Sequence, residues 1–171
     1  MSELTRMIDA RQLPPGPIDI KASVAECAAL AQRFGLVRVK HLSARITLTR
    51  DGPTVRAAGR INADIVQSCA ISAEDLPVRI HEPVALHFVP ANSTPATDGE
   101  VELDAEQLDQ IEMDGHQFDL GEALAQGLAL AIDPYAEGPG AEEARREAGL
   151  LEPSDEGPFA GLKALMLKLP D

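Results

Sequence analysis

Five basic side chains are placed by their spacing on one face of two neighbouring segments of the chain. Residues 36–50 and 53–69 alternate between apolar and polar residues, which predicts two strands joined by the turn at 50–53. The basic residues on the polar side of this ribbon are Arg38, Lys40, Arg45, Arg56 and Arg60. Cations spaced along a ribbon suit contacts with successive phosphates. A solvated outer face that pairs with acidic residues of the same chain explains the pattern equally well.

A run of acidic residues is the second group with a candidate chemistry. Residues 98–122 contain ten Asp and Glu side chains and no Lys or Arg. The run lacks the ligand spacing of an EF-hand calcium loop, so we expect a solvated acidic surface rather than a metal site. It is also a candidate surface for a basic partner, through Glu100, Glu102, Asp104, Glu106, Asp109, Glu112 and Asp114.

The residue types that support catalysis or metal binding do not gather in the sequence. Cys27 and Cys69 follow the apolar sides of a predicted helix and a predicted strand, so we expect both thiols to be buried and inert. The four histidines are scattered, without the close Cys or His pairs of a zinc site. A glycine-rich phosphate loop is also missing. We therefore expect no catalytic residue, metal, cofactor or small-molecule substrate.

Charge is distributed unevenly along the 171 residues, which carry a net charge of −13. Residues 1–60 contain ten basic and five acidic side chains, whereas residues 61–171 contain five and 23. The basic part offers a face for phosphates, while the overall charge opposes non-specific binding to nucleic acid. The sequence shows neither an apolar run long enough to span a bilayer nor a signal-peptide pattern. We expect a cytoplasmic protein that does not contact membranes.

The elements that must position these residues belong to an α+β fold. Residues 36–50, 53–69 and 76–89 are three alternating segments with short links, which predict an antiparallel β-meander or a partly closed barrel with helices packed on it. The first segment changes its apolar side near residues 41–43, which indicates a β-bulge. A short strand at 18–21 precedes a helix that begins with a Ser23–Glu26 capping box. The expected apolar face of that helix is Val24, Cys27, Ala28, Leu30, Ala31 and Phe34.

The second half of the chain is expected to combine a polar loop with helices. Residues 90–99 have loop composition, 100–103 fit a short strand, and a helix begins after Asp119 and ends before Pro134. Glu122 stands at the capping-box position of this helix. A polar helical piece at 142–148 and an apolar piece at 159–169 follow. We treat residues 1–171 as one domain, with 90–116 as an acidic loop region and 136–171 as a partly flexible tail.

Several segments together resemble the YceD family, bacterial proteins named for large ribosomal RNA subunit accumulation. The resemblance covers about residues 35–169, and its strongest part is 118–135. It is carried by the sequence VRAAGRINA at 55–63, Cys69, LPVRI at 76–80, the acidic stretch, FDLGEALAQGLALAIDPY at 118–135 and PFAGL at 158–162. The resemblance also implies structural roles for Gly59 and Cys69.

The resemblance implies a role in the synthesis, processing or stability of large-subunit (23S) ribosomal RNA, without known catalytic residues. Many members of the family carry Cys-x-x-Cys where this chain has Cys69-Ala-Ile-Ser72. Because Ser72 replaces the second cysteine, the metal or redox pair of those members is not carried over.

Two hypotheses for the function remain open. The first is a non-enzymatic ribosome-biogenesis factor that binds large-subunit ribosomal RNA or a ribosomal protein. The alternative is a protein-interaction module that binds a basic partner through residues 98–122 and does not contact RNA. An enzyme ranks third, because a nucleophile, a base and an orienting group cannot be placed together from this sequence.

Overall fold

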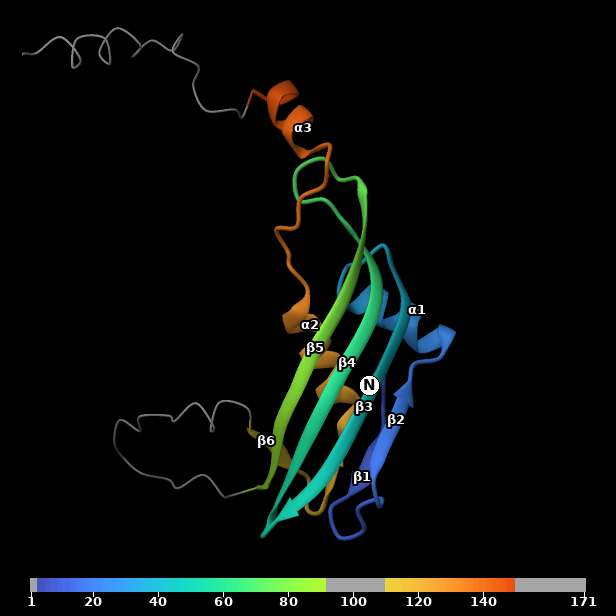
Figure 1. Ribbon diagram of the computed structural model, residues 1–171, viewed down its shortest axis with the longest axis vertical. Coiled ribbons are helices and arrows are strands. Elements are labelled where there is room, and N and C mark those ends of the chain that lie inside the picture. The colour runs from blue at the N-terminus through green and yellow to red at the C-terminus, as the bar shows by residue number, and fades with distance from the viewer. Residues whose placement is uncertain (1–2, 92–109, 150–171) are drawn as a thin grey trace, which may run out of the picture.

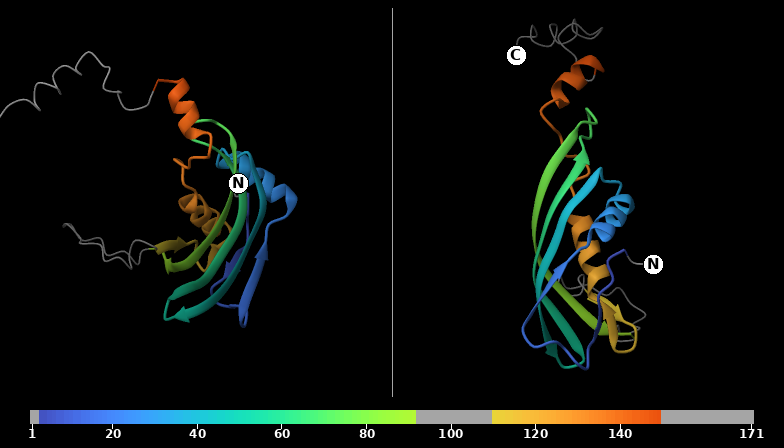
Figure 2. Two further views of the ribbon diagram at one scale, coloured as in Figure 1. Left: turned by 45° about the horizontal axis from the view of Figure 1, so that its top comes forward. Right: turned by 90° about the vertical axis from the view of Figure 1, so that its right-hand side faces the viewer.

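The structure is a computed structural model, and it describes residues 3–91 and 110–149. Its elements are β1 (Met7–Asp9), β2 (Pro17–Lys21), α1 (Val24–Arg33), β3 (Arg38–Asp51), β4 (Thr54–Ser68), β5 (Asp75–Pro90), β6 (Gln110–Met113), β7 (Gln117–Asp119), α2 (Leu120–Ala131) and α3 (Ala141–Glu147). Figures 1 and 2 show a curved sheet with α1 and α2 on the same side, while α3 lies beyond one end of the sheet. None of the described helices is long and apolar enough to cross a bilayer.

The main sheet has five strands in the order β2-β3-β4-β5-β6. Neighbours from β2 to β5 are antiparallel, whereas β6 runs parallel to residues 87–90 of β5. The fold is therefore α+β, and the meander predicted for residues 36–50, 53–69 and 76–89 is confirmed as β3, β4 and β5. The prediction of a partly closed barrel is wrong for the described residues, because β2 and β6 lie at opposite edges of the sheet. Helix α2 packs against β4 and β5 on the side that a barrel would enclose.

A long hairpin of β3 and β4 carries the predicted basic residues. Its turn contains Gly52 with a φ of +60°, a conformation that glycine adopts without steric cost. The pairing register shifts between Val39 and His41, which confirms the predicted bulge slightly earlier in the chain. On the other side of this bulge Val39 still faces the core. Because of the bulge, the apolar side chains before and after it lie on the same side of β3, although the alternation of apolar and polar residues shifts by one position there.

The core lies between the sheet and the helices. Residues of the predicted apolar side of β4 and of α2 are buried in it, among them Val55, Ala57, Ile61, Ala63, Ile65, Leu120, Leu124 and Leu128. Helix α1 contributes Cys27, Leu30 and Ala31. Its predicted apolar face is wrong at Val24, which is 90% exposed, and at Ala28, which is exposed. Val24 and Ala28 instead border an open depression between α1 and the start of β3, which Val37 and Lys40 also line.

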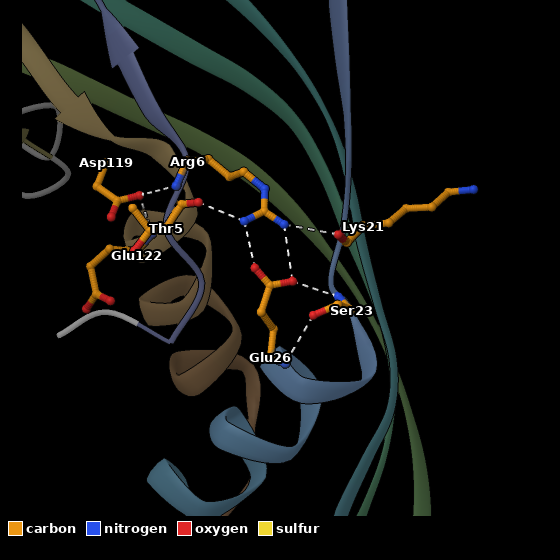
Figure 3. Close-up of polar contacts among 7 residues, drawn as sticks. All are labelled: Thr5, Arg6, Lys21, Ser23, Glu26, Asp119 and Glu122. Carbon is orange, nitrogen blue, oxygen red and sulfur yellow. Dashed lines mark hydrogen bonds and ion pairs between the residues drawn. The ribbon is translucent and has the colours of Figure 1, made fainter.

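The N-terminal strand ties both helices to the fold (Figure 3). β1 pairs with β7, and the backbone N–H of Arg6 donates to Asp119 Oδ1 at 2.7 Å. The Arg6 guanidinium donates to both carboxylate oxygens of Glu26, at 2.7 and 3.2 Å. Glu26 also forms the predicted capping box with Ser23, and Asp119 caps α2 as predicted. These contacts fix the beginnings of α1 and α2 relative to each other.

The remaining predicted elements divide between described and undescribed residues. The short strand at 18–21 is β2, and the polar helical piece at 142–148 is α3, so both predictions are confirmed. The strand expected at 100–103 and the apolar piece expected at 159–169 lie outside the described residues.

Candidate nucleic-acid interface

The five predicted basic residues are all exposed, and register pairing places four of them on the side of the sheet that faces away from α1 and α2. Lys40 is the residue inserted at the bulge. We call this side the outer face; the residues with side chains on it or at its bulge include Asp19, Lys21, Arg38, Lys40, His41, Ser43, Arg45, Thr47, Thr49, Arg56, Ala58, Arg60, Asn62, Asp64, Arg79, His81, Pro83, Ala85 and His87. It is the convex side of the curved sheet (Figure 2, right).

The basic residues of the outer face form an extended array rather than one cluster. Arg45 of β3 lies directly opposite Arg60 of β4. Arg56 is four residues from Arg60 on the same strand, about 13 Å away at roughly 3.3 Å per residue. Arg38 and Lys40 lie beyond these residues, at the far end of β3 and next to the bulge. A long anionic polymer fits this arrangement better than a single small anion does.

Opposed arginines are an unfavourable arrangement within a sheet. Like charges directly opposite each other on neighbouring strands destabilise the pair, and Arg45 and Arg60 are such a pair. These two arginines belong to a row of residues that crosses the sheet perpendicular to the strands, and their neighbours in this row are Asp19 on β2 and Pro83 on β5. Arg45 Nε lies 3.5 Å from Asp19 Oδ1, whereas no ion pair to Arg60 occurs within residues 3–91 and 110–149. This row therefore holds more positive than negative charge.

The acidic neighbours of the outer-face arginines hold them weakly. Arg56 Nη2 lies 3.9 Å from Asp51 Oδ2, and the two side chains are 57% and 76% exposed. The Arg45 and Asp19 side chains are 70% and 61% exposed. Exposed ion pairs of this kind contribute about 0–1 kcal/mol to stability. An external phosphate can therefore replace either carboxylate at small cost.

Sequence reasoning missed several outer-face residues of the neighbouring strands. Arg79 of β5 lies opposite Asp64, and its Nε is 3.5 Å from the Oδ1 of that residue. Lys21 of β2 lies opposite Ser43, and its side chain points away from the helices in Figure 3. The signal for Arg79 was present, because it occupies the polar side of the segment 76–89 whose apolar side defined the strand. Lys21 required the pairing of β2 with β3.

The bulge end of the outer face is hollowed. A shallow depression of about 480 Å³ is lined by Lys40, Asp64, Ile65, Pro77, Val78 and Arg79. A second depression of about 230 Å³ adjoins it and is lined by Val37, Arg38, Lys40, Val66, Asp75 and Pro77. Lys40 borders both hollows because the bulge inserts it between the regular positions of β3. Arg38, Lys40 and Arg79 thus converge at this end.

Cys69 differs from the inert thiol that the sequence predicts. It is buried, as expected, but the backbone N–H groups of Ser72 and Gly138 each donate to its Sγ at 3.3 Å. Hydrogen bonds from Ser72 and from these backbone groups lower the pKa of the Cys69 thiol to about 7. The lowered pKa favours the Cys69 thiolate more than the sequence suggests, while the burial of the side chain is as expected. Burial raises the pKa of Cys27, which agrees with the expectation.

The acidic candidates are only partly placed. Glu112 on β6 and Asp114 directly after it are exposed. Glu100, Glu102, Asp104, Glu106 and Asp109 lie outside the described residues. Within the described part of the chain, no group of three or more His, Cys, Asp or Glu side chains is arranged to hold a metal ion.

Comparison with known proteins gives one family. Residues 57–166 match the family described as Large ribosomal RNA subunit accumulation protein YceD. No curated protein matches, and no solved structure matches. The matched range contains Arg60, Arg79 and Cys69 and begins after Arg38, Lys40, Arg45 and Arg56.

Proposed function

The chain belongs to the YceD family, and we propose that it supports the accumulation of large-subunit ribosomal RNA by binding that RNA, without catalysing a reaction. In this proposal the outer face contacts the RNA phosphates. The family description names accumulation of the large ribosomal RNA subunit, and a protein that covers RNA can promote its accumulation by protecting or folding it.

The observation that carries this proposal is the set of basic side chains on the outer face. Arg45, Arg56 and Arg60 are exposed and weakly paired or without an ion-pair partner among the described residues. Phosphate contacts provide most of the affinity of proteins for nucleic acids, and arginine binds phosphate with paired hydrogen bonds. Two opposed arginines that cost stability in the free protein become favourable when a phosphate lies between them.

The net charge of −13 limits where RNA can approach. The exposed acidic residues Glu112 and Asp114 lie at the β6 edge of the sheet, away from β2 and β3. Repulsion from acidic parts of the surface disfavours loose binding and orients the RNA towards the basic part. We therefore expect binding that is strongly dependent on salt.

The test is a titration of large-subunit ribosomal RNA fragments over a salt series, with transfer RNA as competitor. We expect the variant Arg56→Glu/Arg60→Glu to bind more weakly and to lose about 0.7–0.9 from the slope of log affinity against log salt for each phosphate contact removed. A control variant, Arg11→Glu/Arg146→Glu, carries the same change in net charge on exposed residues outside the outer face. An unchanged affinity and salt slope in the Arg56→Glu/Arg60→Glu variant would contradict the proposed interface.

The alternative is capture of a basic protein through the acidic segment, and the exposure of Glu112 and Asp114 agrees with it. Under this alternative, deletion of residues 98–109 together with Glu112→Gln and Asp114→Asn abolishes binding to a basic ribosomal protein. The Arg56→Glu/Arg60→Glu variant then binds that protein normally.

A further inference from the structure

The outer face combines cations with short polar side chains along regular strands. Thr47 and Thr49 of β3 are exposed beside Arg45 and Arg56, and Ser43 lies opposite Asn62. Hydroxyl and amide groups of this length reach phosphate oxygens and ribose hydroxyls when the cations already hold the backbone. The chemistry on this face therefore fits the sugar and phosphate of a nucleic acid.

The phenylalanine rings of the described residues do not lie on the outer face. Phe88 and Phe118 stack on each other in the core, with their ring centroids 4.0 Å apart. Phe34 packs at the end of α1, and Tyr135 belongs to the segment that follows α2. Sheets that bind single-stranded RNA stack its unpaired bases on aromatic side chains of the binding face. Among the described residues, the strands carry no Phe or Tyr at an outer-face position, and the rings there are the smaller imidazoles of His41, His81 and His87. His41 and His81 are hydrogen-bonded to Ser43 and Asn62. The cations of this face therefore favour contacts with the backbone over stacking on the bases.

The shape of the outer face also favours the sugar-phosphate backbone as its ligand. The hollows on this side lie at the bulge end, around Lys40, and the middle of the sheet curves outward (Figure 2, right). Its cations are spread over β2 to β5 rather than along one channel, from Lys21 through Arg45 and Arg60 to Arg79. A single strand is normally followed by a basic groove. A convex, broad surface instead fits the wide and shallow minor groove of A-form RNA, where phosphates and 2′-hydroxyls are accessible.

Building on the proposed function, we propose that the outer face binds double-helical RNA through its phosphates and 2′-hydroxyls, with little preference for base sequence. Arg45 and Arg60 hold one phosphate between them, and Arg56 contacts another. Thr47 and Thr49 lie in the same part of the face and contact ribose hydroxyls, which distinguishes RNA from DNA.

The experiment compares three fluorescein-labelled probes by fluorescence anisotropy with the full chain: an RNA duplex, a DNA duplex of the same sequence, and an unstructured pyrimidine RNA strand of the same length. We expect the RNA duplex to bind several-fold more tightly than either of the other probes, and a duplex of shuffled sequence to bind like the first. Equal or tighter binding of the single strand would overturn this inference and leave the proposed function in place. Failure of both RNA probes and of large-subunit RNA fragments would overturn the proposed function itself.

Two variants separate the phosphate contacts from the hydroxyl contacts. Arg45→Gln/Arg60→Gln removes charge-assisted hydrogen bonds, so we expect RNA-duplex affinity to fall by about tenfold or more; the control Arg11→Gln/Arg146→Gln, with the same change in charge, leaves it near the wild-type value. Thr47→Val/Thr49→Val keeps the shape and strand propensity, and we expect it to reduce the preference for the RNA duplex over the DNA duplex. A preference that is unchanged in this variant would contradict the hydroxyl contacts. Circular dichroism of each variant confirms that these exposed substitutions leave the fold intact.

Discussion

At the scale of single residues, Cys69 shows how a local motif changes the chemistry of a buried side chain. The segment from Cys69 to Ser72 turns back on itself, so that Ser72 lies beside the Cys69 side chain. Its backbone N–H and that of Gly138 donate to Cys69 Sγ. Because Gly138 follows α2, the thiol links the turn between β4 and β5 to the segment before α3. These donors stabilise the thiolate, which explains the lowered pKa.

We expect the Cys69 thiol to titrate at a pH of about 7, since hydrogen bonds from Ser72 are the largest cause of its lowered pKa. The ultraviolet absorbance of the thiolate measures this titration, with Cys69→Ala as the blank for Cys27. In Ser72→Ala we expect the pKa to move upwards, because the hydroxyl donor is lost. A titration in the wild type near the ordinary value of 9.0 would contradict the described hydrogen bonds.

The same shift predicts how stability depends on pH. A thiol whose folded pKa is below its unfolded pKa stabilises the fold at high pH, and this contribution is lost as the pH falls through the folded value. The advantage of the wild type over Cys69→Ala in urea unfolding should therefore grow between pH 7 and pH 9. A constant difference across that interval would show that the thiolate contributes nothing to stability.

At the scale of elements, the contact between α2 and the N-terminal segment depends on a glycine. A Cβ atom at Gly121 would lie 2.1 Å from the backbone oxygen of Leu4, whereas a Cβ atom at Gly127 on the same helix would lie 3.4 Å from Ile61 Cδ1. The first position admits no side chain without moving backbone. The second meets only the end of a side chain. Two glycines of one helix therefore have different structural roles.

We expect Gly121→Ala to destabilise the protein by about 1–3 kcal/mol, because it separates α2 from the N-terminal segment. The matched control Gly127→Ala should be neutral or stabilising by up to about 1 kcal/mol, because alanine favours the helix and the contact is small. Urea unfolding of both variants measures the difference. Equal stability of the two variants would contradict the close packing at Leu4.

Local signals in the sequence were sufficient for much of this architecture. The capping box of Ser23 and Glu26, the Asp119 cap and the bulge near Lys40 depend on neighbouring residues, and the structure confirms each of them. The parallel pairing of β6 with β5 and the pairing of β1 with β7 join residues that are far apart in the chain. The local alternation of apolar and polar residues therefore could not reveal them. The exposure of Val24 likewise depends on where α1 meets β3.

In the candidate site, too, some features follow from local sequence patterns and others require the tertiary fold. Alternation along β3 and β4 was enough to place the arginines of the outer face. The pairing of Arg45 with Arg60, the approach of Arg79 to Lys40 and the hydrogen bond from Gly138 to Cys69 require the register or the tertiary fold. The acidic residues from Glu100 to Asp109 stay a prediction from sequence.

At the scale of the whole molecule, the sheet separates two surfaces of different chemistry. The helices α1 and α2 and the stacked rings of Phe88 and Phe118 lie on its concave side. The convex side carries Lys21, Arg45, Arg56, Arg60 and Arg79, whereas Arg50 of β3 pairs with the core residue Val55 and donates to the backbone oxygen of Ala10. The two depressions that α1 and α2 border are lined mainly by apolar residues. An RNA ligand should therefore contact one side of the molecule and leave the other unchanged.

The most direct test of this account is a titration of the isotope-labelled protein with a large-subunit ribosomal RNA fragment, followed by backbone amide NMR. We expect the largest chemical-shift changes at Arg45, Thr47, Arg56 and Arg60 and in the neighbouring outer-face residues of β3 and β4. Residues of α2 that line the depression on the opposite side, such as Leu130, should keep their shifts. Changes confined to α1 and α2, with β3 and β4 unaffected, would contradict binding of RNA by the outer face.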